Sequence, residues 1–233
     1  MTHISKPLKN NIVKFFLILS ILMMNSFVYA EDVVGKAIKV SGTVHAKLET
    51  QEKRKLSIGK SIFEKDLVTT EKDSSVTLLF SDETRFELGA DSSLQVNKYL
   101  FEKDAGKDSS SIEVIKGTFR FVSGLIAKQK PESMEVNTAV ATIGIRGTNV
   151  VGEVNATSAT IILVEPEDSS TKTAIEVSNK FGSVTIDEPG YGTEIPDAYS
   201  PPSPPRRMSL QTINNLTRSL QSIQRVNMPR PMR

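Results

Sequence analysis

Short runs in which apolar and polar residues alternate fill the chain from residue 35 to about residue 187. A period of two is typical of strands that bury one face. The clearest case is a hairpin, in which the alternation of residues 76–80 is followed by a polar turn at 81–83 and resumes at 86–88. Further strands are predicted at 37–46, 94–100, 112–115, 118–122, 134–138, 149–154, 159–164, 174–177 and 183–186.

Glycines separate these runs, at positions where a turn needs a residue that tolerates positive φ; they are Gly42, Gly59, Gly89, Gly117, Gly124 and Gly182. No segment of this region repeats apolar residues at helical spacing, and the polar stretches 48–55, 104–111 and 165–172 are predicted as loops. The sequence therefore predicts an all-β fold of short, mostly antiparallel strands, arranged as a sandwich or a twisted β-solenoid.

The composition changes at Pro196, where a proline-rich segment begins. We expect a β domain over 31–195, a stiff linker over 196–207 and a basic helical tail over 208–233. Within the tail, residues 209–226 predict an amphipathic helix, whose apolar stripe and nearby arginines are candidate interaction residues: Leu210, Ile213, Leu216, Leu220 and Ile223, with Arg218 and Arg225. Such a stripe packs on the β domain, pairs with itself or binds a membrane surface.

The first thirty residues have the three parts of a secretory signal peptide. Three lysines precede the apolar run 15–24, and Val28-Tyr29-Ala30 offers small or modest side chains at a cleavage site. The apolar run is shorter than the ~20 residues that a membrane span needs. We expect cleavage after Ala30 and a periplasmic or secreted protein; an uncleaved amino-terminal anchor is the alternative.

Charge and composition narrow the function classes. The chain has no cysteine, which excludes disulfides, thiolate metal sites and cysteine nucleophiles. His45 is the one histidine after residue 30, so no multi-histidine metal site is expected. Residues 31–205 hold 20 basic and 27 acidic side chains, whereas the residues from Arg206 onward hold six arginines and no acid. An acidic body is a poor nucleic-acid binder.

The motifs of catalysis are not found in the sequence. There is no nucleophile elbow, zinc-binding helix or glycine-rich nucleotide loop. Carboxylates such as Asp66, Asp82 and Glu83 leave a two-carboxylate glycan-processing enzyme as an alternative. They fall at predicted turns, however, and the chain has no tryptophan to form a sugar platform. We therefore predict a protein that is not an enzyme and needs no cofactor or metal.

Three stretches resemble the FecR domain. They are the opening GKAIKVSGTVHA at 35–46, the segment from LSIGKSIFEKDLVTTEKDSSVTLLF through SDETRFELGADSSLQV at 56–96, and NTAVATIGIRGTNVV at 137–151. The last is similar to the family's "TP-x-A…RGT" segment and matches it at Thr138, Ala141, Arg146, Gly147 and Thr148, although Ala139 replaces the usual proline.

The Arg-Gly-Thr segment also has a physical interpretation of its own. Gly144 and Gly147 flank Ile145-Arg146 between two apolar runs, a spacing that suits a tight connection or a bulge. We interpret Arg146 as a structural clamp in apolar surroundings, with Glu165 or Asp66 as a carboxylate partner; a ligand contact is the alternative.

The resemblance implies a periplasmic all-β signalling or binding domain. In the best-known members this domain senses an outer-membrane receptor and passes the signal to a cytoplasmic anti-sigma segment. Only about fourteen residues precede the apolar run here, so that segment is not expected. We predict a binding or scaffold module for an envelope protein or a cell-wall polymer, through a strand edge or the tail. The alternative is a sensor subunit whose transmembrane regulator is a separate protein.

Overall fold

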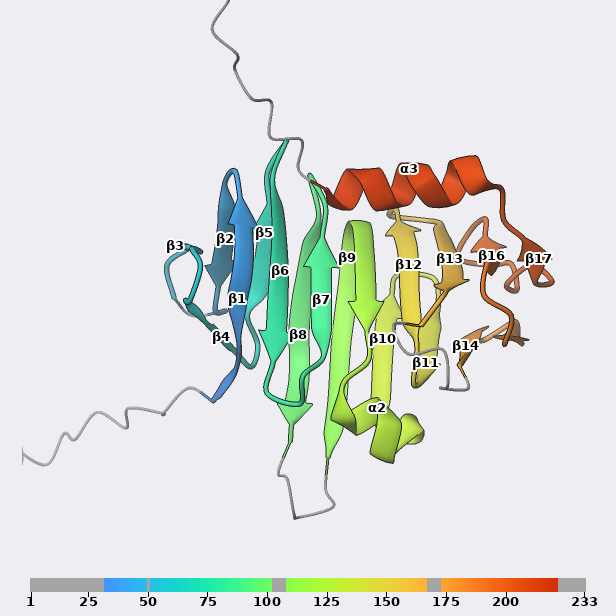
Figure 1. The fold of residues 1–233 in the computed structure, drawn as a ribbon, viewed down its shortest axis with the longest axis horizontal. Helices are drawn as coiled ribbons and strands as arrows, with labels where there is room; N and C mark the ends of the chain where they lie inside the picture. The colour runs from blue at the N-terminus through green and yellow to red at the C-terminus, as the bar shows by residue number, and fades with distance from the viewer. Residues whose placement is uncertain (1–31, 50, 102–107, 167–172, 222–233) are drawn as a thin grey trace, which may run out of the picture. The chain divides into compact units, whose positions relative to one another are not determined.

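The computed structural model describes residues 32–49, 51–101, 108–166 and 173–221. The predicted signal peptide, Ile223 and Arg225 lie outside the described residues. All strands belong to one hydrogen-bonded network, which is mostly antiparallel and folds into two layers (Figure 1). The prediction of an all-β fold is therefore confirmed.

Each layer is a series of neighbouring strands, and β9 belongs to both. The front layer runs in the order β4 (Ser61–Phe63), β1 (Val33–Ser41), β6 (Ser75–Phe80), β7 (Arg85–Leu88), β9 (Ser109–Val122), β12 (Asn149–Val154), β13 (Ala159–Val164), β16 (Tyr191–Ile195) and β17 (Arg206–Arg207). The rear layer runs in the order β3 (Arg54–Lys55), β2 (Val44–Lys47), β5 (Leu67–Thr70), β8 (Ser93–Leu100), β9, β10 (Met134–Thr138), β11 (Thr142–Arg146), β14 (Ala174–Asn179) and β15 (Gly182–Ile186).

The long strand β9 connects the two layers. Residues 109–116 pair with β8, and residues 117–122 pair with β7 and β12. Gly117 lies at the change of layer with φ of 99°, a conformation that side chains rarely allow. The sequence pattern predicted two strands separated by this glycine, and the structure shows that they are one. β9 and β10 are parallel neighbours.

The core lies between the layers and is formed by the inward side chains of both. Its largest members include Phe86, Phe119 and Phe121, which are fully buried. The Phe86 ring lies 5.6 Å from the Phe119 ring and 5.8 Å from the Phe121 ring. The predicted hairpin β6–β7 supplies one of these rings, and its register pairs Leu78 with Phe86.

Several elements differ from the sequence predictions. β11 and β16 were not predicted, and neither was the short helix α2 (Leu125–Gln129) with the 3₁₀ turn η1 (Pro131–Ser133) that follows it. The predicted loop 104–111 is wrong at its end, because Ser109 already belongs to β9. Within the described residues, no helix is both long and apolar enough to cross a membrane.

The C-terminal helix α3 (Leu210–Leu220) lies across one end of the front layer (Figure 1). It begins at Ser209, whose hydroxyl accepts a hydrogen bond from the Thr212 amide at 3.0 Å.

The proline-rich segment before α3 also contacts the sheet. Its Ser203 amide bonds to the Glu194 carbonyl, and the Thr193 hydroxyl donates to the Ser203 carbonyl. The segment therefore runs along β16.

Candidate binding groove at the Gly147–Thr148 turn

A groove of about 590 Å³ lies at the end of the front layer, and we call it the motif groove; its lining residues are Leu79, Glu83, Arg85, Val122, Ser123, Gly124, Lys128, Gly147, Thr148, Asn149 and Pro166. Its floor is a row of side chains on neighbouring strands. Leu79 pairs with Arg85, Arg85 with Val122, and Val122 with Asn149. These positions alternate with the inward phenylalanines of the same strands, so they face outward.

The rim of the groove is formed by two turns and the helix α2. Glu83 belongs to the β6–β7 turn, Lys128 to α2, and Gly147 to the β11–β12 turn. Glu83 and Gly147 have φ of 70° and 59°, so both turns use the left-handed backbone region. Lys128 and Glu83 are exposed. The rim therefore carries charges of both signs above a partly apolar floor.

Buried Asp82 fixes the wall between the hairpin and α2. Its carboxylate accepts hydrogen bonds from the Thr84 amide at 2.9 Å, the Thr84 hydroxyl at 2.8 Å and the Ile126 amide at 3.1 Å. The Tyr99 hydroxyl donates to the same carboxylate. Gly124 lies so close that a Cβ atom there would be 2.2 Å from the Asp82 carbonyl oxygen. The wall is thus held by a fully bonded carboxylate.

Tyr99 responds to this environment. Its ring stacks on Phe80, with 4.6 Å between centroids. Burial and the nearby Asp82 charge raise the pKa of the Tyr99 hydroxyl well above its ordinary value of 10.0. The hydroxyl therefore stays protonated and keeps its hydrogen bond to Asp82. We therefore interpret the Tyr99–Asp82 pair as structural, because its hydrogen bonds hold together the hairpin and α2, which form the wall of the groove.

Thr148 carries a buried hydroxyl that has no partner among the described residues. Its backbone is satisfied, since its amide donates to the Ser123 hydroxyl at 2.8 Å and its carbonyl accepts from the Ser123 amide at 3.0 Å. The side chain is only 3% exposed, yet Oγ1 bonds to nothing in the described part of the chain. Leaving a buried hydroxyl unpaired costs about 1–3 kcal/mol. The oxygen lies beneath the surface of the groove, and the buried hydroxyls of Ser109 and Ser110 also have no partner among the described residues.

The predicted motif residues are not gathered in one place. Gly147 and Thr148 line the motif groove, whereas Gly144 and Arg146 lie on β11 and line a second hollow of about 500 Å³ on the rear layer. There Gly144 pairs with Glu135 on one side and Glu176 on the other. A Cβ atom at Gly144 would have only ordinary contacts, at 3.8 Å or more. Of the two predicted alternatives, a tight connection or a bulge, the structure has the tight connection, at Gly147, whereas Gly144 lies in a regular strand.

The prediction that Arg146 lies in apolar surroundings is wrong. The side chain is exposed, and no ion pair of it occurs among the residues that the structure describes. Asp66, one of the proposed partners, instead accepts two hydrogen bonds from Arg54 and one from the Phe63 amide. The strand register explains this, because Arg146 ends β11 with an outward side chain.

Thr138 and Ala141 form a separate turn. The Thr138 hydroxyl donates to the Ala141 carbonyl and accepts from the Ala141 amide, both at 3.0 Å. Asn179 joins this turn to the C-terminal segment, since its side-chain amide donates to the carbonyls of Val140 and Ser200. These motif residues therefore organise the backbone and lie away from the groove.

The predicted tail residues on α3 fall into a buried group and an exposed group. Leu216 and Leu220 are buried with Val151, Ile162 and Met208, and Ile213 packs partly against this cluster. Packing on the β domain, one of the predicted alternatives, thus occupies the centre of the stripe. Leu210 is 76% exposed and Arg218 is exposed as well.

Among the described residues, the candidate carboxylates Asp66, Asp82 and Glu83 do not form a reactive pair at the groove. Asp66 and Asp82 are fully buried and bonded to the groups described above, while Glu83 stands on the rim. No group of three metal-ligating side chains occurs in the described residues.

Sequence reasoning missed the groove residues Arg85, Ser123 and Lys128. The hairpin pattern could have placed Arg85 outward, because it alternates with inward Phe86. Ser123 and Lys128 belong to the unpredicted region around α2, so no strand pattern could place them.

Comparisons with known proteins identify a family for part of the chain. Residues 66–179 match the FecR protein family. Two crystal structures of a candidate anti-sigma factor from Parabacteroides distasonis, at 2.50 Å and 1.65 Å resolution, are each similar with 12% sequence identity and a TM-score of 0.49. Each match covers 64% of this chain and 62% of the solved chain. No protein of curated function matches the sequence. The resemblance seen in the sequence is confirmed from residue 66 onward, whereas the stretch 35–46 lies outside the match: residues 66–179 of this chain form a FecR domain.

Proposed function

We propose that this protein is a non-catalytic binding module of the cell envelope, which holds a segment of another envelope protein in the motif groove. The observation that carries the proposal is the motif groove itself, which the FecR domain builds with a partly apolar floor and exposed rim charges of both signs.

The lining favours a polypeptide as the ligand. The floor offers apolar Leu79 and Val122, and the rim offers Lys128 beside Glu83. A peptide segment with an apolar side chain and a carboxylate would match this mixture. None of the groove residues is aromatic, so a cell-wall glycan would lack the stacking platform that such ligands commonly use. A protein partner is therefore preferred to a cell-wall polymer.

The groove can be tested by affinity capture from solubilised envelopes. Lys128→Glu reverses an exposed rim charge, whereas Lys60→Glu reverses an exposed charge in the turn before β4 and serves as the matched control. We expect both variants to melt like the unaltered protein. The same partner should be captured by wild type and Lys60→Glu, and recovered severalfold less with Lys128→Glu. Equal recovery with both variants would reject the groove.

The FecR domain also favours a second candidate, a sensor subunit that works with a separate transmembrane regulator. The two candidates differ in the partner that the groove holds. A captured protein with a transmembrane helix and a cytoplasmic regulatory domain would support the sensor. A structural envelope protein would support the scaffold. A purified glycan that binds in place of any protein would contradict both.

We further propose that residues 1–30 direct export and are removed, so that the protein acts in the periplasm or outside the cell. The support is the lysine-rich start, the apolar run and the Val28-Tyr29-Ala30 site. Amino-terminal sequencing of the protein recovered from the periplasmic fraction should give Glu31 as the first residue. A protein that begins at Met1 and stays with the membrane fraction would support the anchor instead.

A further inference from the structure

The sheet ends in four terminal strands, and one of them differs from the others. β3, β4 and β17 contain only two, three and two residues, and short edge strands of this kind resist pairing with other chains. β15 has five residues, Gly-Ser-Val-Thr-Ile, without a charge or a proline. It therefore lacks the usual features that keep an edge from pairing.

One side of β15 is available for hydrogen bonding. The strand pairs with β14 from Gly182 to Ile186, and β16 lies nearby, but no register of hydrogen-bonded residues joins β15 to a second strand among the described residues. Ser183 and Thr185 are exposed, whereas Ile186 is buried and Val184 packs partly on the core. The inward side chains hold the strand in place, so its outer edge is presented by a fixed element.

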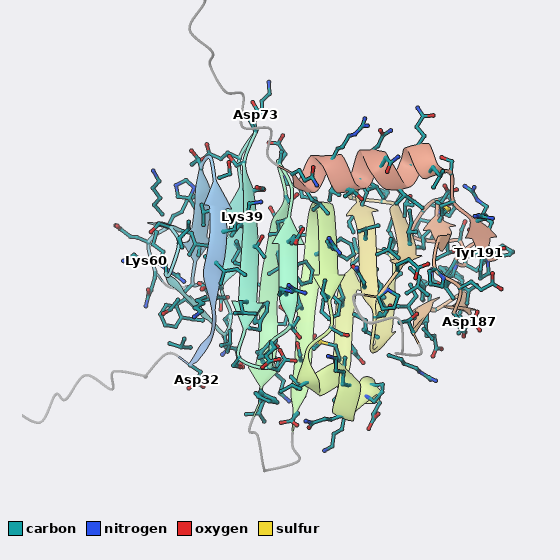
Figure 2. The ribbon with its side chains drawn as sticks, viewed as in Figure 1. Asp32, Lys39, Lys60, Asp73, Asp187 and Tyr191 are labelled. Carbon is teal, nitrogen blue, oxygen red and sulfur yellow. The ribbon has the colours of Figure 1, made fainter. Side chains whose placement is uncertain are left out.

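The two ends of β15 carry opposite charges. Exposed Lys180 precedes the strand, and its ammonium lies 4.9 Å from the Phe181 ring centre and 5.9 Å from that of Tyr199. Exposed Asp187 and Glu188 follow the strand. Figure 2 shows Asp187 at the end of the molecule beyond the body of the sheet. The edge strand therefore has a positive charge at its beginning and negative charges at its end.

We propose that β15 pairs with β15 of a second copy of this chain, antiparallel about a two-fold axis near Val184. In this arrangement the beginning of one strand lies beside the end of the other, so Lys180 of each copy approaches the Asp187–Glu188 pair of its partner. Ser183 and Thr185 of opposite copies become cross-strand neighbours, a favourable pairing of hydroxyl side chains. A two-fold axis makes every contact occur twice.

The charge pattern identifies a second copy as the occupant. A parallel arrangement would place like charges together at each end, which is destabilising. An unrelated strand would need its own matching charges at both ends, whereas a second copy supplies them by symmetry. Pairing along five residues buries less surface than a standard stable interface, so we expect a weak dimer that forms in the micromolar range or above.

Sedimentation of the purified protein over a range of concentrations tests the inference. The average mass should rise from that of a monomer toward that of a dimer. Lys180→Glu and Glu188→Lys should each shift the protein toward the monomer, because each brings like charges together. The combined exchange Lys180→Glu/Glu188→Lys should restore the dimer, since the opposite charges meet again with their positions exchanged.

Thr185→Lys provides a second line of evidence at the centre of the edge. Its side chain is exposed, so the variant should fold, and two lysines near the axis should prevent pairing. A protein that stays monomeric at all concentrations would overturn the proposal. So would a dimer that none of these variants weakens. No envelope partner takes part in these measurements, and their failure would leave the proposed function of the motif groove intact.

Discussion

The two ends of the front layer's outer face have opposite character, although the same strands form both. At one end Val151 of β12 is sealed beneath α3 with Ile162, Leu216 and Leu220. At the other end Asn149 of the same strand lies on the floor of the motif groove. The two residues are two positions apart on one strand face. Asn149 is buried as well, but its side chain accepts a hydrogen bond from Arg120 and donates one to the Glu165 carbonyl, so one strand face has an apolar contact at one end and a polar contact at the other.

We interpret the end beneath α3 as a contribution to stability and the end with the motif groove as a contribution to binding. The end beneath α3 buries apolar side chains, which stabilises the fold without presenting a polar group. The open end has exposed charged residues on its rim, and the buried Thr148 hydroxyl beside them has no hydrogen-bond partner among the described residues. Asp82 contributes to both ends of this comparison. Its carboxylate is hydrogen-bonded within the protein, and these bonds hold the wall of the groove in place. Substitutions at the three places should therefore have distinct effects.

The largest loss of stability is expected from Asp82→Ala. The change leaves the Tyr99 hydroxyl, the Thr84 amide and the Ile126 amide without their buried acceptor. Each unpaired group costs about 1–3 kcal/mol, so we expect a loss of about 4 kcal/mol in the free energy of unfolding. Denaturant unfolding measures it. Asp32→Ala, at an exposed carboxylate, is the control, and a similar small change in both variants would refute the role of Asp82.

The covered end should be sensitive to cavity formation. Leu216→Ala removes a buried side chain from the contact with Val151 and should lower the free energy of unfolding by about 2–3 kcal/mol. Leu210→Ala on the same helix changes a side chain that is 76% exposed, so it should change stability by less than about 0.5 kcal/mol. Thermal melting of both variants tests this, and equal midpoints would mean that α3 is not held by its apolar stripe.

The Tyr99–Asp82 bond predicts a pH dependence. In the unfolded chain Tyr99 ionises near pH 10.0, whereas its pKa is higher in the folded protein. The folded state therefore holds this proton more tightly, and its contribution to stability is complete below pH 10.0 and declines as the pH rises toward the folded pKa. At neutral pH Tyr99→Phe should cost about 1–2 kcal/mol.

The difference in unfolding free energy between wild type and Tyr99→Phe should shrink above pH 10. Denaturant titrations at a series of alkaline pH values measure it. Tyr199→Phe alters a ring that is 78% exposed and should leave stability unchanged. A constant difference between wild type and Tyr99→Phe across that pH range would show that the buried hydroxyl does not hold its proton as described.

The smallest change in stability is expected at Thr148, together with a loss of binding. Thr148→Val removes the unpaired hydroxyl and keeps the shape, so stability should rise or stay within about 1 kcal/mol. Partner binding should fall about three- to tenfold if the ligand bonds to Oγ1. Thr77→Val, on the same outer face but away from the groove, controls for removal of a hydroxyl. Unchanged binding in Thr148→Val would assign the hydroxyl to the fold alone.

The fold could be predicted where one face of a strand is buried. β10, β12 and β13 begin and end at the predicted residues, because their apolar positions recur regularly. β11 has the same alternation at Ile143 and Ile145, and it was missed because Gly144 was interpreted as part of a tight connection or a bulge. β16 was missed because its buried central residue, Thr193, is polar. α2 has only five residues, too few for a helical period to be recognised.

The candidate site could be predicted only in part. The family resemblance brought attention to Gly147 and Thr148, which line the groove. It could not show that Arg146, one residue earlier, lies on the opposite layer, because this depends on the strand register. Asp82 had the pattern of an ordinary turn residue. Its burial results from Tyr99 and α2, which are distant in sequence, and local patterns carry no information on such contacts.

The central claim is that the motif groove holds a partner protein, and site-specific photocrosslinking in intact cells tests it most directly. A photoreactive amino acid is placed at Lys128 on the groove rim or at Lys60 in the turn before β4, both of which are exposed. The account predicts one discrete protein adduct from position 128, weakened when the rim charge is reversed by Glu83→Lys, and no such adduct from position 60. The same adducts from both positions, or none from position 128, would contradict it.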